Sequence, residues 1–252
     1  MSFKDHFSRL ATSYTRYRPH YPKELFDYLA SLAAERERAW DCATGNGQAA
    51  LGLAQHFDQV IATDASAQQL ANAVKHEKII YKISAAEKTE IESASVDLVT
   101  VAQALHWLDL DRFYNEAKRV LKPDGVIAIW FYRFIYVSDE IDHLLEEYHE
   151  SIVKPFWSPE NKIADEDALL IPFPFEEIPS PPILMEASWD LEHLKGFLGT
   201  WSATQKYKDQ NNADPVETIA ERLQTLWGDP STRRKISWPL ILRVGRRPDS
   251  SL

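Results

Sequence analysis

Short apolar runs alternate with helical patterns through the first half of the chain. Mostly apolar runs bounded by polar turns predict buried strands, and apolar residues that recur every three or four positions predict amphipathic helices. The predicted strands cover residues 38–42, 59–63, 78–83, 96–102 and 126–131, and the predicted helices cover 22–34, 47–55, 66–76 and 111–121. Strands that alternate with helices in this way indicate an α/β fold, a mostly parallel sheet with helices on both faces.

Local signals support several of these boundaries. Pro22 stands at the predicted start of the first helix, where its missing N–H costs nothing. Ser66 and Gln69 have the spacing of a capping box, which predicts a helix start at Ser66. The sequence KPDG at residues 122–125 is typical of a turn and predicts the end of the helix before the fifth strand.

The second half of the chain has a different pattern. A predicted helix at 139–153 is followed by a proline-rich passage, which includes IPFPFEEIPSPP and predicts no long regular element. Two further strands are predicted at 183–189 and 238–244, with helices at 191–201 and 215–227 between them. Because the strands complete the sheet, we interpret the helices as a cap over the strand ends. A second domain that begins near Val137 is the alternative.

Composition narrows the function classes. The chain has 252 residues, 44% of them hydrophobic and 26% charged, which is ordinary for a globular protein. It contains no apolar run of membrane-spanning length, and its first residues lack the apolar region of a secretory signal, so we expect a cytoplasmic protein with no membrane partner. The formal net charge of −10 disfavours nucleic acid as the main partner. The single cysteine, Cys42, excludes an intrachain disulfide and a multi-cysteine metal site, and we predict an inert buried thiol and no metal.

The turn after the first strand, in DCATGNGQ, carries the first candidate chemistry. Ligands of open α/β sheets bind outside the carboxyl ends of the strands, and the first strand-to-helix turn is the usual cradle. A GxGxxG dinucleotide fingerprint read from Ala43 and Gly45 would require a glycine where this chain has Gln48. The spacing with Gly47 favours instead the GxGxG pattern of S-adenosylmethionine sites. A tight turn that serves packing alone is the alternative.

Acidic residues follow the next strands. Asp64 ends the second predicted strand, where a carboxylate can accept hydrogen bonds from both hydroxyls of a ribose. A helix-capping aspartate is the alternative. The segment SAAE at residues 84–87 follows the third strand, where an adenine ring would lie. Glu87 is alternatively a solvated loop charge.

Together, the segments YTRYRPHYP, DCATGNGQAALGLAQHFDQVIATDAS, SVDLVTVAQALHWLD and RVLKPDGVIAIW resemble the class I S-adenosylmethionine-dependent methyltransferases. They are most similar to the group with a type 11 methyltransferase domain that includes the trans-aconitate methyltransferases. The resemblance implies a Rossmann-like sheet of seven strands with the last antiparallel, bound S-adenosylmethionine, and methyl transfer to a small-molecule acceptor. The chain departs from the pattern at Ala43, which replaces the first glycine and should crowd the turn slightly.

The resemblance also implies roles for particular residues. The methionine portion of the cofactor should lie against Asp41, Ala43, Gly45, Gly47 and Gln48. The ribose and adenine should lie against Asp64, Ala65, Ala86 and Glu87, and Gln103 should face the sulfonium. Tyr14 and Arg18 should close over the cofactor, with Arg18 paired to its carboxylate unless it is a surface arginine stacked on aromatic rings.

The same resemblance implies a single methyltransferase domain over residues 1–252. Its expected parts are a cofactor-covering segment at 1–36, a cofactor-binding core at 37–136, the sixth strand and helical cap at 137–236, and the final strand and tail at 237–252. The sequence does not predict an oligomeric state.

His106 and Trp107 follow the fourth strand, and Tyr132 follows the fifth, so all three are candidate acceptor-binding residues, with His106 the candidate catalytic residue. A carboxylate acceptor is ionised at neutral pH and needs no base, unlike most hydroxyl or amine acceptors. The leading hypothesis is methyl transfer to a carboxylate oxygen of a small organic acid that His106 orients. The alternatives are transfer to a hydroxyl or amine with His106 as base, a non-catalytic S-adenosylmethionine-binding regulatory protein, and a nicotinamide oxidoreductase, which Gln48 disfavours.

Overall fold

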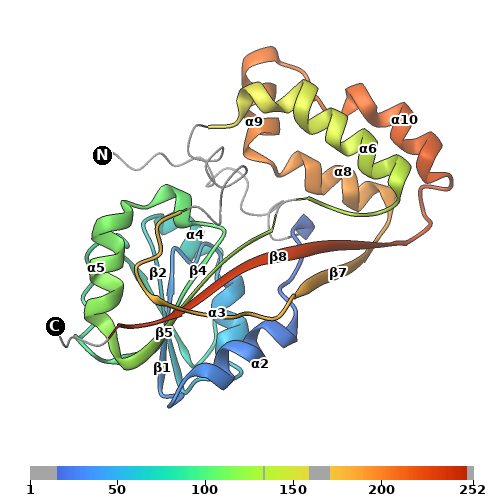
Figure 1. Ribbon diagram of the computed structural model, residues 1–252. Helices are drawn as coiled ribbons and strands as arrows, with labels where there is room; N and C mark the ends of the chain where they lie inside the picture. The colour runs from blue at the N-terminus through green and yellow to red at the C-terminus, as the bar shows by residue number, and fades with distance from the viewer. Residues whose placement is uncertain (1–15, 133, 159–170, 249–252) are drawn as a thin grey trace.

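A computed structural model describes residues 16–132, 134–158 and 171–248, and a single sheet runs through it (Figure 1). The strands are β1 (Arg38–Cys42), β2 (Gln59–Asp64), β3 (Ile79–Ile83), β4 (Val96–Ala102), β5 (Leu121–Tyr132), β6 (Glu176–Ile178), β7 (Leu184–Trp189) and β8 (Arg234–Arg246). They pair in the order β3-β2-β1-β4-β5-β8-β6, and β7 also pairs with β8. The pairs among β1 to β5 are all parallel, whereas β8 is antiparallel to every neighbour.

The strands β6 and β7 act as one interrupted sixth strand. Along the same edge of β8, β6 pairs with residues 244–246 and β7 with 234–239, while Tyr136 bridges to Ser237 from the opposite side. Residues 179–183, PSPPI, separate the two pieces because proline cannot donate to a strand ladder. Counted in this way, the described sheet has seven strands with only the last in sequence antiparallel, which confirms the predicted fold class.

Helices cover both faces of the sheet (Figure 1). They are α2 (Lys23–Leu32), α3 (Gln48–Leu53), α4 (Ala67–Ala71) and α5 (Leu110–Val120). Alternate residues of β5 enter two separate cores: Val126, Ala128 and Trp130 pack in the core that contains α2 and α3, and Ile127 and Ile129 pack in the core that contains α5. This alternation follows from the strand period of two, and burial on both faces explains why the central strands are almost continuously apolar.

A helical cap lies beyond the carboxyl ends of the parallel strands, where β7 and β8 extend from the sheet (Figure 1). It contains α6 (Asp139–Glu147), the π-helix η3 (Tyr148–Val153), the 3₁₀ turn η4 (Lys154–Phe156), α8 (Leu191–Gly199), α9 (Ser202–Asn211) and α10 (Glu217–Trp227). Trp189 and Trp238 are buried beneath it with ring centroids 4.8 Å apart, and Trp227 is also buried. Within the described ranges, no helix is long and apolar enough to cross a membrane.

Several predicted boundaries were wrong. The predicted helix at 66–76 is shorter: Ser66 caps it as expected, but it ends at Ala71, and the Tyr81 hydroxyl donates to the Val74 carbonyl at 2.9 Å in the following turn. The predicted turn at 122–125 lies inside β5 as a bulge, with Asp124 at φ +61°. The predicted helix at 139–153 divides into α6 and η3, and β6 and α9 were not predicted.

Candidate functional site

The turn between β1 and α3 alternates left-handed residues. Ala43, Gly45 and Gly47 have φ values of +54°, +56° and +83°. A Cβ on Gly47 would lie 2.3 Å from the Tyr81 hydroxyl oxygen, whereas a Cβ on Gly45 would meet no atom within 4 Å. Gly45 is therefore required by its backbone conformation, and the space beside it is open. Ala43 adopts a conformation that costs an L-residue free energy.

Asp41 is fully buried beneath this turn. Its carboxylate accepts hydrogen bonds from the hydroxyls of Thr44 and of Thr100, the latter at 2.9 Å. Burial raises the pKa of Asp41 to about 6, although these hydrogen bonds favour the charged form. Its side chain therefore supports the turn from inside the fold.

Asp64 joins the turn to the end of β2. Its Oδ2 accepts from the Gly45 N–H at 2.8 Å, and its Oδ1 accepts from the Ser66 N–H at 2.8 Å. The carboxylate thus lies beside the glycine turn, as the ribose-binding prediction requires, and it also orders the start of α4, as the capping alternative requires. Ala65 beside it is exposed.

The other residues predicted near the adenine differ in burial. Ala86 is buried in the core that contains α5. The Glu87 Oε1 accepts from the Asp109 N–H at 3.1 Å. Glu87 therefore anchors the residue that caps α5, and it is not simply a solvated loop charge.

Gln48 and Arg18 connect the amino-terminal segment to the rest of the molecule. Gln48 Nε2 donates to the Pro19 carbonyl at 2.8 Å and lies 3.2 Å from His20 Nδ1. Arg18 donates from Nη1 to the Tyr132 hydroxyl at 3.1 Å and from Nη2 to the Thr200 carbonyl at 3.3 Å. Its guanidinium also lies over the ring of Phe197, 5.2 Å from the centroid. Tyr14 lies outside the described residues.

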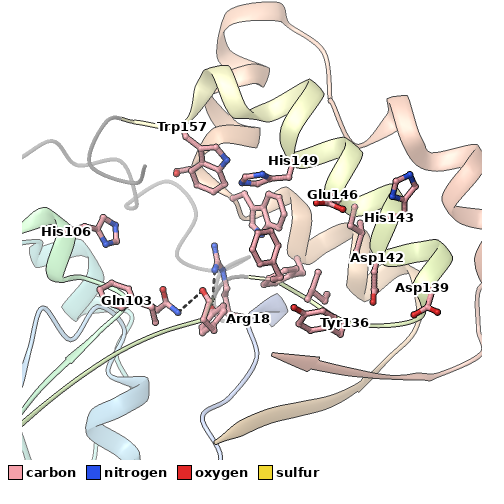
Figure 2. Close-up of a pocket in the computed structure, with 18 of the residues that line it drawn as sticks. Arg18, Gln103, His106, Tyr136, Asp139, Asp142, His143, Glu146, His149 and Trp157 are labelled. Atoms are coloured by element: carbon pink, nitrogen blue, oxygen red, sulfur yellow. Dashed lines mark hydrogen bonds between the residues drawn. The ribbon is translucent and has the colours of Figure 1, made fainter. Parts of the chain in front are cut away.

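A cavity of about 660 Å³ separates the sheet from the cap (Figure 2). Five residues that the sequence singled out line it: Arg18, Gln103, His106, Trp107 and Tyr132. The predicted site residues therefore form two groups, one at the β1–α3 turn and the ends of β2 and β3, and one at this cavity.

The sheet side of the cavity is built at the carboxyl ends of β4 and β5. Gln103 has φ +56°, its N–H donates to the Trp130 carbonyl at 2.9 Å, and its Nε2 donates to the Tyr132 carbonyl at 3.2 Å. His106 lies in the 3₁₀ turn η2 (Leu105–Trp107), with its ring centroid 4.9 Å from that of Trp107 and 6.0 Å from that of Phe131. These contacts present His106 to the cavity on an aromatic support.

Sequence reasoning missed most of the cap side of the cavity. That side is lined by Phe134, Ile135, Tyr136, Asp139, Asp142, His143, Leu145, Glu146, His149, Trp157, Phe197, Trp201 and Ser202. The polar residues of α6 in this set recur at spacings of three and four, so they share one helix face. That periodicity was the signal in the sequence that could have predicted a polar face of α6 toward the site. Of the tryptophans in the second half, Trp157 and Trp201 line the cavity, whereas Trp189 and Trp227 are buried in the core.

Comparisons with known proteins identify the family. A family model described as a methyltransferase domain matches residues 40–129. A curated Dictyostelium discoideum protein, named as a methyltransferase, is 36% identical over 253 residues, which cover 97% of this chain and 96% of the relative. The chain belongs to the class I S-adenosylmethionine-dependent methyltransferases. The hypothesis of a nicotinamide oxidoreductase is therefore wrong.

Solved structures agree with this family. A structure from Anaeromyxobacter dehalogenans, described as a type II methyltransferase, has a TM-score of 0.86 and 38% identity, and the match covers 91% of this methyltransferase and 98% of that chain. A phosphoethanolamine N-methyltransferase of Haemonchus contortus, solved with S-adenosylhomocysteine, shares the fold at a TM-score of 0.51 and 18% identity, over 99% of this chain and 61% of its own.

S-adenosylmethionine is the cofactor of this methyltransferase, and the turn between β1 and α3 fits it. The space beside Gly45 is open, so a ligand can approach the backbone there. The Asp64 carboxylate stands at the end of β2 next to that space, bonded to the Gly45 N–H. A carboxylate that accepts hydrogen bonds suits the hydroxyls of an uncharged ribose better than a pyrophosphate, whose negative charge it would repel.

Proposed function

We propose that this methyltransferase transfers the methyl group to a carboxylate oxygen of a small organic acid bound in the cavity between sheet and cap. The observation that supports this most directly is the position of Arg18 in the cavity wall. Hydrogen bonds to the Tyr132 hydroxyl and the Thr200 carbonyl hold its guanidinium in place, and a positive charge at this point of the cavity wall favours an anionic acceptor. A fixed cation in a partly buried site attracts an anion more strongly than it would in water.

The reaction asks little of the protein's side chains. Bound S-adenosylmethionine supplies an electrophilic methyl group on a sulfonium. A carboxylate, with a reference pKa of about 4, is ionised at neutral pH, so no proton has to be removed. The task of Arg18, Gln103 and His106 is to hold the acceptor in line with the methyl group, and alignment alone can contribute about 7–11 kcal/mol.

The cap side of the cavity limits the charge of the acceptor. Asp139, Asp142 and Glu146 line the cavity from α6. Among the described residues that line it, Arg18 is the one that carries a permanent positive charge. A second or third carboxylate on the acceptor would face these like charges, which is unfavourable. We therefore propose a monocarboxylate, a narrower class than the tricarboxylate of the trans-aconitate methyltransferases.

Arg18 variants test this proposal against the role predicted from the sequence. Methyl-labelled S-adenosylmethionine is incubated with a panel of mono-, di- and tricarboxylic acids, and cofactor affinity is measured separately by titration calorimetry. For Arg18→Gln we expect the KM of the preferred acid to rise by about 10- to 100-fold, because one or more charge-assisted hydrogen bonds to the acceptor are lost. We expect little change in cofactor affinity.

The matched variant Arg18→Lys keeps the charge and loses the fork of donors, so we expect an intermediate KM. A large fall in cofactor affinity with an unchanged acceptor KM would instead assign Arg18 to the cofactor carboxylate and would contradict the proposal.

Transfer to a hydroxyl or amine is the second candidate, because His106 lines the cavity and could act as base. In that case His106→Gln should abolish turnover rather than reduce it.

A further inference from the structure

Five aromatic rings form a cluster on the cap side of the cavity, called the cap cluster here: Phe134, His149, Trp157, Phe197 and Trp201. The ring centroids of Trp157 and Trp201 are 5.9 Å apart, and His149 lies 6.0 Å from Trp157 and 6.1 Å from Trp201. Phe134 and Phe197 extend the cluster, 6.1 Å from His149 and 6.0 Å from Trp201 respectively. Figure 2 shows His149 and Trp157 on the side of the cavity away from Gln103 and His106.

The backbone holds this cluster in an unusual way. His149 lies on the π-helix η3, a form that is rare and found often at functional sites. Tyr148 beside it is fully buried, and its hydroxyl bonds to that of Thr204 on α9 at 2.9 Å. The π-turn is thus fixed to α9, and His149 on it lies against Trp157 and Trp201.

The cluster is arranged to meet a ligand. Its rings are tilted, with interplanar angles of 41° between Trp157 and Trp201 and 79° between His149 and Trp201, and all five of them line the cavity. The Trp157 indole Nε1 is buried and has no hydrogen-bond partner among the described residues. Phe134 and Tyr136, which both line the cavity, are 43% and 48% exposed, so a ligand bound there can cover apolar surface of both rings.

We propose that the acceptor carries a planar aromatic or conjugated body, which the cap cluster binds while the reacting group faces His106 and Gln103. Aromatic rings recognise planar π-systems through offset stacking and edge-to-face contacts, which saturated rings of equal size cannot make. The inference rests on the proposed function for the carboxylate, and it adds the class of the acceptor's body.

The size of the cavity agrees with such an acceptor. Its volume of about 660 Å³ lies within the range of about 300–1,000 Å³ for sites that enclose drug-sized ligands. A short aliphatic acid would leave much of the cap cluster uncovered, whereas an arylalkenoic acid can reach from the sheet side to the cap side.

Binding of matched acids tests the inference. The wild-type protein is saturated with S-adenosylhomocysteine, and trans-cinnamate and 3-cyclohexylpropanoate are titrated calorimetrically. Each ring contact is expected to favour the aryl acid by about 2- to 12-fold. With several rings in reach, we expect at least about fivefold tighter binding of cinnamate. Equal affinity, or tighter binding of the cyclohexyl acid, would overturn the inference.

Variants of the cluster show whether it is the source of this preference. Trp157→Leu should lower the ratio of the two affinities toward one, and Trp157→Phe should retain more of it. The control is Tyr207→Leu: Tyr207 packs on Phe156 at 4.9 Å in the cap but does not line the cavity, so the ratio should not change. Affinity for S-adenosylhomocysteine and the thermal transition establish that each variant is folded. A ratio unchanged in folded Trp157→Leu would contradict the assignment.

A second pair of probes separates this inference from the proposed function. Cinnamyl alcohol and 3-cyclohexylpropan-1-ol differ in the same way but carry no carboxylate. If only the alcohols bind and the aryl alcohol is preferred, the aromatic body stands and the carboxylate proposal fails. If the acids bind without an aryl preference, the carboxylate proposal stands and the inference fails. Binding of neither pair overturns the inference.

Discussion

Ala43→Gly should stabilise the protein although it removes a methyl group. Ala43 has φ +54° in the turn between β1 and α3, a left-handed conformation that costs an L-residue about 1–2 kcal/mol and costs glycine almost nothing. Glycine also has more conformational freedom than alanine in the unfolded chain, and this stabilises the unfolded state by about 0.4–1 kcal/mol, which offsets part of the gain. The difference predicts a net gain of about 0.5–1 kcal/mol in the free energy of unfolding.

Urea unfolding of three Ala→Gly variants measures this effect with its controls. Ala94 also has a left-handed backbone, with φ +51°, and it is exposed and distant in sequence from the turn. Ala94→Gly should therefore give a similar gain in the free energy of unfolding without any effect on cofactor affinity. Ala67 is exposed at the start of α4, where glycine should cost about 0.5–1 kcal/mol. If Ala43→Gly destabilises the protein as much as Ala67→Gly does, the turn is not strained and the reasoning is refuted.

Three further predictions concern carboxylates and His106. If the Asp64 carboxylate accepts hydrogen bonds from the ribose hydroxyls, Asp64→Asn should weaken S-adenosylmethionine binding by at least about tenfold in calorimetry, because the charged acceptor is lost; unchanged affinity would remove Asp64 from the site. His106→Gln should keep a measurable fraction of turnover, with no histidine-like pKa in the pH–rate profile, and near-total loss would make His106 a base. Burial would raise the pKa of Glu116, but hydrogen bonds from Arg119 and Thr89 outweigh it and lower the pKa to about 2. Ionised Glu116 therefore contributes up to about 3 kcal/mol above pH ~4.5, which is lost as the pH falls toward 2. Glu116→Gln should reduce the difference in the free energy of unfolding between pH 7 and pH 3, measured in urea, by about 2 kcal/mol, and an unaltered difference would contradict the assignment.

The sheet was predictable where its signals are local. The bounds of β1 and β4 match the prediction residue for residue, because both strands are buried on both faces and their apolar runs end at turns. The three residues of β6 are largely polar and become a strand only by pairing with β8, so nothing in their own sequence indicates it. The helix α9, SATQKYKDQN, has a weak apolar face and depends on its contacts within the cap.

The candidate site divides in the same way. The turn residues Ala43, Gly45 and Gly47 lie within a few positions of one another, so their spacing could be read directly. The cap side of the cavity brings together residues as distant as Phe134 and Trp201, whose proximity depends on how α6, η3 and α8 pack. Arg18 shows the limit: the sequence predicted that it pairs with the cofactor carboxylate and left stacking on an aromatic ring as the alternative, but its position in the cavity wall required the fold.

The chemical nature of the methylated product tests the central proposal most directly. The protein is incubated with methyl-labelled S-adenosylmethionine and a fractionated metabolite extract, and the labelled product is isolated and treated with mild alkali. A carboxyl methyl ester releases its label as methanol under these conditions, and this is the result we predict. A label that stays on the product through the alkali treatment, as in an ether or a methylamine, would contradict methyl transfer to a carboxylate.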